Sequence, residues 1–226
     1  MMLTRLPCTL VAALVTCSLF AAPASAQRAR TFVASFGLDT NPCTFASPCK
    51  TFQHAIDVVL AGGEVTAIDS AGFGPITITH AVTITSPAGI EAGIVPPTGG
   101  TAITINAGPS DAVVLRGLTV NGAGIGQNGI VFNSGGSLTI ASCVVQNSVF
   151  DGSHITTGNG ILIQPASGTV DFVITDTIVT KNGTGGIQYL PTGGSPSVNG
   201  TIDQVTATSN GFFGIAVNPL NPTGGL

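Results

Sequence analysis

The stretch GIVF at residues 129–132 decides the fold, because its pattern of glycine, isoleucine, any residue and an apolar residue returns three times. The later copies begin at Gly160, Gly186 and Gly214, at intervals of 31, 26 and 28 residues. A second pattern recurs in phase with the first. It starts with Leu or Ile, has small or apolar residues three and five positions later, and has an asparagine soon after. Its copies start at Leu115, Ile140, Ile174 and Ile202. Two patterns in step four times indicate a repeat protein.

Each repeat contains short runs of alternating apolar and polar residues, which are typical of half-buried strands. Glycine, asparagine and serine at the ends of these runs indicate turns. Such a unit cannot bury its own apolar face, so stacked units must close a continuous core. The leucine spacing of a leucine-rich repeat is absent. We therefore predict an all-β fold, a parallel β-helix solenoid of about six coils over residues 64–217.

The composition excludes several classes of protein. The chain has 226 residues, of which 43% are hydrophobic and 7% charged, so it is expected to fold rather than remain disordered. Lys and Arg number 6 against 10 Asp and Glu, a formal charge of −4, so we expect no nucleic-acid partner. A coiled coil would need far more Glu, Lys, Ala and Leu.

Residues 1–26 are predicted to be a secretory signal peptide. Arg5 gives the positive start, residues 10–20 form the apolar segment, and Ala24-Ser25-Ala26 gives the cleavage site. We expect a secreted or periplasmic protein without a membrane span, since no stretch approaches about 20 apolar residues. Two alternatives remain: a buried N-terminal helix, and a lipoprotein modified at Cys17, although the threonine before it fits that signal poorly.

Three cysteines follow the signal peptide. Cys43 and Cys49 lie six residues apart in a proline-containing loop, and export to an oxidising compartment predicts a disulfide between them. Cys143 lies among apolar positions and is predicted to be a buried, inert thiol. Paired Cys and His spacing of the kind that binds zinc is absent from the sequence, and no metal is expected.

Residues 27–63 are predicted to contain an amphipathic helix that caps the first coil. Ser47 is the predicted N-cap, Pro48 the first helical residue, and the glycines at 62 and 63 the end, about 13 residues later. The apolar face would consist of Phe52, Ala55, Ile56 and Val59. The first strands are expected at residues 64–69, 76–79, 82–85 and 102–106.

Four repeated asparagines are predicted to stack at one turn of the solenoid and to hydrogen-bond along its axis. They are Asn121, Asn147, Asn182 and Asn210. Ligand binding by these residues is the less favoured alternative.

The run TFVASFGLDTNPCTFASPCKT at residues 31–51, the expected cap helix and the Gly-Ile coils together resemble bacterial right-handed parallel β-helix proteins of the pectate-lyase-like superfamily. The resemblance covers most of residues 31–217 and is closest to secreted members without assigned activity. It implies the right-handed fold but little about function, because that fold hosts lyases, hydrolases, adhesins and inert scaffolds.

The motifs of the superfamily's enzymes are missing. The Asn-Thr-Asp, Asp-Asp and Arg-x-Lys strings of polygalacturonases do not occur, and the repeats have too few acidic residues for a calcium cage. Repeat offsets bring four charged residues to nearby coils, and these form the only catalytic group we nominate: Arg116, Asp176, Lys181 and Asp203. An exposed ion-pair group is the favoured alternative. The outward row through Val131 is mostly apolar, which predicts that something covers it.

After Val217, residues 218–226 form a Pro/Gly-rich tail without a recognisable cap. The tail could fold over the last coil, a partner could cover it, or the chain could belong to a longer protein. We favour the last possibility or self-association through the uncapped end.

For function, we expect a structural, adhesive or polysaccharide-associated protein that is not an enzyme, whose partners are a polysaccharide or another envelope protein. The alternative is a lyase or hydrolase acting on an acidic polysaccharide. No cofactor is expected, and Ca²⁺ only if the lyase alternative holds.

Overall fold

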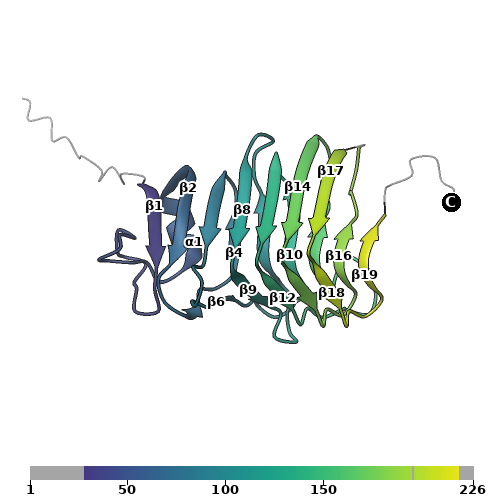
Figure 1. Ribbon diagram of the computed structural model, residues 1–226, viewed down its shortest axis with the longest axis horizontal. Helices are drawn as coiled ribbons and strands as arrows, with labels where there is room; N and C mark the ends of the chain where they lie inside the picture. Colours follow the sequence, from purple (N-terminus) through teal and green to yellow (C-terminus); the bar gives the residue numbers. More distant parts are fainter. Residues whose placement is uncertain (1–27, 195, 219–226) are drawn as a thin grey trace, which may run out of the picture.

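The computed structural model describes residues 28–194 and 196–218. Its strands form three parallel sheets that wind around one core as a β-solenoid, with successive turns stacked along the long axis (Figure 1). The predicted signal peptide and nearly all of the predicted tail lie outside the described residues. The described part contains no helix with the length and apolar character that membrane crossing requires.

The sheets contain seven, six and six strands. Sheet A consists of β1 (Arg28–Val33), β2 (Val59–Ala67), β5 (Val82–Thr85), β8 (Ala112–Arg116), β11 (Ser137–Ala141), β14 (Thr169–Thr175) and β17 (Ser197–Asp203). Sheet B consists of β3 (Ala71–Gly72), β6 (Ala92–Ile94), β9 (Leu118–Asn121), β12 (Val144–Gln146), β15 (Ile178–Thr180) and β18 (Thr206–Thr208). Sheet C consists of β4 (Ile76–Ile78), β7 (Thr101–Asn106), β10 (Asn128–Ser134), β13 (Asn159–Ile163), β16 (Gly185–Tyr189) and β19 (Phe213–Val217).

The core is built from side chains that repeat from coil to coil. In sheet C, Ile103, Ile130, Ile161 and Ile187 pair in register and are at most 2% exposed. Sheets A and B contribute equivalent rows, such as Leu115, Ile140 and Ile174. Each fully buried side chain of this size contributes roughly 1.5–3 kcal/mol relative to an exposed one. The Ile of the Gly-Ile pattern is therefore the part that fills the core.

The Gly of the same pattern marks the corner where the chain enters sheet C. A Cβ on Gly160 would lie 2.4 Å from Cγ1 of Val179 and 2.9 Å from the carbonyl oxygen of Gly186. Gly129 and Gly186 are equally confined by backbone and core atoms of neighbouring coils. Glycine recurs here because successive coils approach too closely for a side chain.

The corner between sheets A and B requires left-handed backbone. Gly117, Ser142, Asp176 and Gln204 occupy it in successive coils, with φ of 69°, 55°, 50° and 52°. A second left-handed corner follows sheet B, at Asn147, Lys181 and Ser209. Glycine, asparagine and aspartate tolerate this conformation best, which explains some of the glycine and polar residues that separate the strand segments in the sequence.

The helix is shorter than predicted and begins later. α1 (Phe52–Val58) has Thr51 as its N-cap, whose hydroxyl accepts a hydrogen bond from the His54 amide at 3.2 Å. The prediction of Ser47 and Pro48 as the first residues was wrong, because Cys49 pairs with β1 instead. The predicted end at residues 62–63 was also wrong, since β2 begins at Val59. The predicted apolar face is buried, and α1 packs against β1, β2 and β4.

The solenoid has seven turns by the strands of sheet A, one more than predicted. The additional strand is β1, which lies ahead of the helix and was not recognised as part of a coil. The predicted disulfide between Cys43 and Cys49 is present, with a Cα–Cα distance of 4.6 Å. It closes the loop that runs beside β1, where Cys43 and Cys49 both hydrogen-bond to the backbone of Phe32.

Candidate functional site

The four nominated residues lie on the outer face of sheet A and at the corners before and after sheet B, and the fold brings only two of them together. Asp176 follows the end of β14, and its backbone amide donates to the carbonyl of Asp203 at 3.2 Å. Arg116 shares a register row with Asp203 but lies three strands away, a backbone separation of about 14 Å. Thr177 and the three residues of β15, which alone span about 10 Å, separate Asp176 from Lys181.

No hydrogen bond or ion pair joins these four side chains within the described residues. Asp176 and Lys181 occupy left-handed corner positions, so the turn geometry already accounts for a polar residue at the first of them. The four residues are exposed. Asp176 and Asp203 lie together, while Arg116 and Lys181 each lie apart, so the four residues occupy three places on the surface rather than one converging group.

Arg116 has a second feature that the sequence did not indicate, a hollow of ≈ 430 Å³ beside it. Its walls are the loop at residues 86–90, the corner residue Gly117 and the next corner residue, Ser142. The Ser86 hydroxyl donates to the Ile90 carbonyl at 2.7 Å and closes this loop, while the Ser86 amide donates to the Arg116 carbonyl at 2.9 Å. A guanidinium at such a position can hold a carboxylate through two parallel hydrogen bonds.

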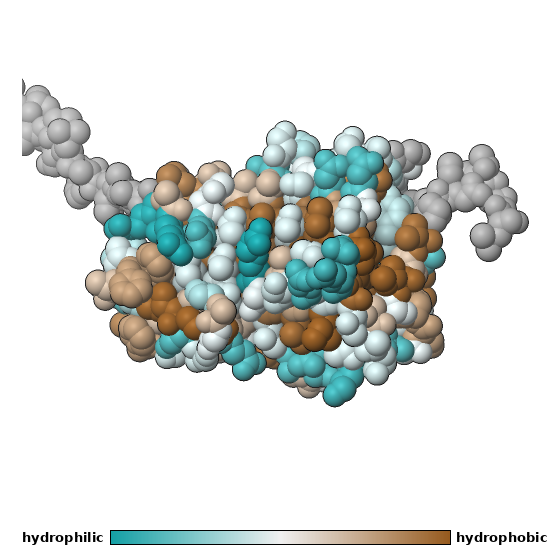
Figure 2. Space-filling model, viewed as in Figure 1, coloured by the Kyte–Doolittle hydropathy of each residue, from teal (hydrophilic) through white to brown (hydrophobic). Residues whose placement is uncertain are grey.

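The outer face of sheet A, on which Arg116 lies, carries side chains that are in strict register from strand to strand. Its middle row consists of Thr83, Val114, Thr139, Val173 and Thr201, one residue from each of five neighbouring strands. The spacing between strands is about 4.8 Å, so equivalent groups repeat along the solenoid at that interval. Figure 2 shows hydrophobic, neutral and hydrophilic residues interspersed over the molecule in this view. Such a face can contact a ligand that itself repeats.

The outer face of sheet C is different. Val131, Leu162 and Gln188 pair in register and face away from the core, yet they are 6%, 1% and 0% exposed. The sequence predicted that this apolar row would be covered, and in the structure it is buried. Both amide atoms of Gln188 lack a hydrogen-bond partner among the described residues. This face does not offer an open groove at these three strands.

The repeated asparagines hydrogen-bond to one another in two pairs. Asn147 donates to the side chain of Asn121 at 3.0 Å, and Asn182 donates to that of Asn210 at 3.0 Å. Between the pairs, Oδ1 of Asn182 accepts from the backbone amide of Ser148 at 3.2 Å, because Asn147 is one position out of register with Asn182. Asn182 is 1% exposed, so its amide satisfies buried backbone groups.

A Ser-His-Asp group lies in the loop between β12 and β13, but its geometry is that of a turn. Nδ1 of His154 lies 2.9 Å from Asp151 Oδ2 and 3.0 Å from Ser153 Oγ. A catalytic relay needs the two partners on different ring nitrogens, and here both meet Nδ1. Hydrogen bonds from the His154 side chain, and then from the amides of His154 and Ser153, hold the pKa of Asp151 below its usual range.

Cys43, Cys49 and His54 place their sulfur and nitrogen atoms within 4.8 Å of one another. The two sulfurs form the disulfide, so neither is a thiolate that could bind a metal. This group is therefore a structural disulfide with a histidine beside it, next to the start of α1.

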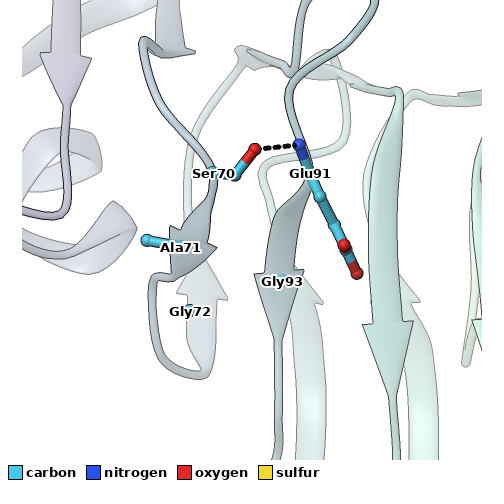
Figure 3. A pocket seen from close by; sticks show the side chains of 5 residues that line it. All are labelled: Ser70, Ala71, Gly72, Glu91 and Gly93. Atoms are coloured by element: carbon cyan, nitrogen blue, oxygen red, sulfur yellow. Dashed lines mark hydrogen bonds between the residues drawn. The ribbon is translucent and has the colours of Figure 1, made fainter.

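Two further hollows lie towards the start of the solenoid. Ser70, Ala71, Gly72, Glu91 and Gly93 line one of ≈ 260 Å³. In Figure 3 the Ser70 hydroxyl accepts the hydrogen bond of the Glu91 amide, 2.9 Å long, and the Glu91 carboxylate extends away from it. Asp57, Thr79 and His80 are among the residues of the other, of ≈ 400 Å³, where Nε2 of His80 is buried and has no hydrogen-bond partner in the described part of the chain. Each contains a single carboxylate, whereas glycoside hydrolysis needs two.

Cys143 is expected to be unreactive in the folded protein. Burial raises the pKa of its thiol to about 11, so roughly 0.1% is thiolate at pH 8, and only the thiolate is nucleophilic. The native protein should not react with a thiol reagent at pH 8, and denatured protein should react fully. Ser142→Cys, an exposed neighbour, gives the matched control that labels in the native state. Rapid labelling of native Cys143 would contradict its buried position.

The chain matches no protein-family model and no curated protein sequence.

Proposed function

We propose that this is a secreted or periplasmic, right-handed β-helix protein of the pectate-lyase-like type that binds an acidic polysaccharide without cleaving it. The binding face is the outer face of sheet A, and its anchor is Arg116 beside the hollow at residues 86–90. The observation that carries the proposal is this exposed guanidinium on a face whose side chains repeat in register.

The repeat spacing supports a polymeric ligand. Rows of threonine and valine at about 4.8 Å intervals offer the same contact again and again, which suits a chain of similar units better than a single small molecule. One carboxylate of the glycan would meet Arg116, and the neighbouring units would lie along the middle row. The disulfide and the N-terminal sequence support an extracytoplasmic location.

Binding should depend on Arg116 and not on total charge. Arg116→Gln is expected to weaken binding of a polyuronate about 10- to 100-fold, because a charged hydrogen bond contributes roughly 1.5–3 kcal/mol. Lys181→Gln removes the same charge from the corner beyond β15 and should leave binding unchanged. Calorimetry of both variants against polygalacturonate and a neutral glucan makes the comparison, at one fixed salt concentration. Equal loss in both variants, or equal binding of the neutral glucan, would contradict the proposal.

The alternative is a lyase or hydrolase in which Arg116 acts as a base. The same samples report it, since lyase products absorb in the ultraviolet and hydrolysis creates new reducing ends. Turnover lost in Arg116→Gln, and in Asp176→Asn or Asp203→Asn, would establish this alternative. Turnover that requires added Ca²⁺ would identify the calcium-dependent form.

A further inference from the structure

The two ends of the solenoid differ in how the edges of their terminal strands are covered. At the N-terminal end the outer edge of β1 is paired with the disulfide loop at Phe32, through hydrogen bonds of 2.9 Å from the Phe32 amide to the Cys43 carbonyl and from the Cys49 amide to the Phe32 carbonyl. The edge of β4 is covered by Gln53 of α1, whose side chain accepts from the Thr77 amide at 2.7 Å and donates to its carbonyl at 3.3 Å. No further strand can pair with these groups.

At the other end, core side chains reach solvent within the described residues. Ile202 is 37% exposed, whereas Ile174, its equivalent one coil earlier, is 0% exposed. Ile215 is 46% exposed against 2% for Ile187. Among residues 28–194 and 196–218, the strands β17, β18 and β19 are the last of their sheets, and each is paired on one side only. Figure 1 shows this end opposite to the helix and the disulfide loop.

We propose that a second copy of this chain covers the C-terminal end, so that two solenoids associate end to end around a two-fold axis. Exposed apolar core and unpaired strands form a self-complementary surface. The groups of β1 and β4 that are already hydrogen-bonded at the N-terminal end oppose head-to-tail growth, so the same end of each copy meets, which gives a closed dimer rather than a fibre. The strands β17 to β19 carry one charged residue, Asp203, and no lysine that would oppose edge pairing.

The register of β17 suits this arrangement. A two-fold axis makes the two β17 strands antiparallel, and pairing centred on Gly200 places Ile202 of one copy beside Val198 of the other, on the core side. Asp203 then lies opposite Ser197, so that no carboxylate faces another. On the other two sides of the solenoid, β18 of each copy meets β19 of the other copy. The two cores become continuous, and Ile215 and Val217 are buried.

The test compares two isoleucines of equal exposure. Ile215 on the open end is 46% exposed, and Ile178 on the outer face of sheet B is 45% exposed. The purified chain is expected to sediment as a dimer of constant mass from low micromolar concentration upwards. Ile215→Lys should raise its dissociation constant at least about 100-fold, because each copy would bury an unpaired ammonium. Ile178→Lys should remain a dimer.

Hydrogen exchange gives an independent readout that a local folding defect in Ile215→Lys would not imitate. The amides of β17 should be protected in the dimer and lose protection when the wild-type chain is diluted below its dissociation constant. A wild-type chain that stays monomeric at all concentrations would overturn the proposal, and is the result expected if residues 219–226 cover the end. A series of growing oligomers would overturn it as well. Neither result depends on glycan binding.

Discussion

Replacing Phe132 by alanine is expected to lower the free energy of unfolding by about 4 kcal/mol. The ring is 0% exposed and packs in the core at the end of the Gly-Ile pattern. Its loss leaves a cavity that coils above and below cannot fill, because each is held in register by its own strands. Urea unfolding followed by circular dichroism measures the change.

Phe36→Ala is the matched control for this prediction. Phe36 is 68% exposed in the loop between β1 and α1, and its loss should change stability by less than about 0.5 kcal/mol. Equal destabilisation by the two substitutions would contradict the assignment of Phe132 to a closed core.

Gly160→Ala is expected to destabilise the protein by about 2–3 kcal/mol, although it adds a single methyl group. That methyl would enter the space held by Cγ1 of Val179 and the Gly186 carbonyl, and the second of these is backbone that cannot turn aside. Thermal unfolding of the variant should show a clearly lower midpoint. The effect tests why glycine opens every copy of the repeat.

Gly72→Ala provides the comparison, since its added Cβ meets no atom within 4 Å and its φ is not in the left-handed region. This variant should be neutral or slightly more stable, because alanine reduces the freedom of the unfolded chain. If Gly160→Ala were as harmless as Gly72→Ala, the close approach of the coils at this corner would be wrong.

The sequence predicted the parts of the fold that repeat. Ile130, Ile161 and Ile187 recur at intervals that a solenoid converts directly into a stacked row, so the periodicity alone indicates their burial. The offset that aligned Arg116 with Asp203 was also correct, because both lie at the same position after a repeated apolar residue. Local patterns suffice wherever one coil has the same environment as the next.

Features that occur once were not predictable in the same way. Ser47 and Pro48 have the local signature of a helix start, but the disulfide and the pairing of Cys49 with β1 hold this segment extended. The N-cap is therefore Thr51, four residues later than Ser47, and the helix begins at Phe52. The hollow beside Arg116 arises from the loop at residues 86–90. The repeat pattern does not predict this loop, because later coils have no counterpart at the same corner.

The nominated cluster shows the limit of reasoning from repeat offsets. Neighbouring offsets suggested that Asp176 and Lys181 could converge with Arg116, yet the chain turns a corner at each of the first two. A corner changes the direction in which a side chain leaves the coil, and offset alone does not contain that information. Repeat offsets also misaligned the asparagines. Asn147 is shifted by one residue, so Ser148 rather than Asn147 hydrogen-bonds to Asn182.

The central claim is that coils stack in parallel and in register, and distances between spin labels test it most directly. Labels at cysteines replacing Thr83 and Thr201 span four strand spacings of sheet A, and labels replacing Thr77 and Ala216 span five of sheet C. The native cysteines do not interfere, because Cys43 and Cys49 are bonded and Cys143 is buried. Labelled chain diluted into unlabelled chain isolates the distances within one molecule.

The stacked coils predict backbone separations of about 19 Å for the first pair and about 24 Å for the second. Two narrow distance distributions that differ by one strand spacing would support the account. Distances that are broad, or that fail to increase with the number of strands between the labels, would contradict it.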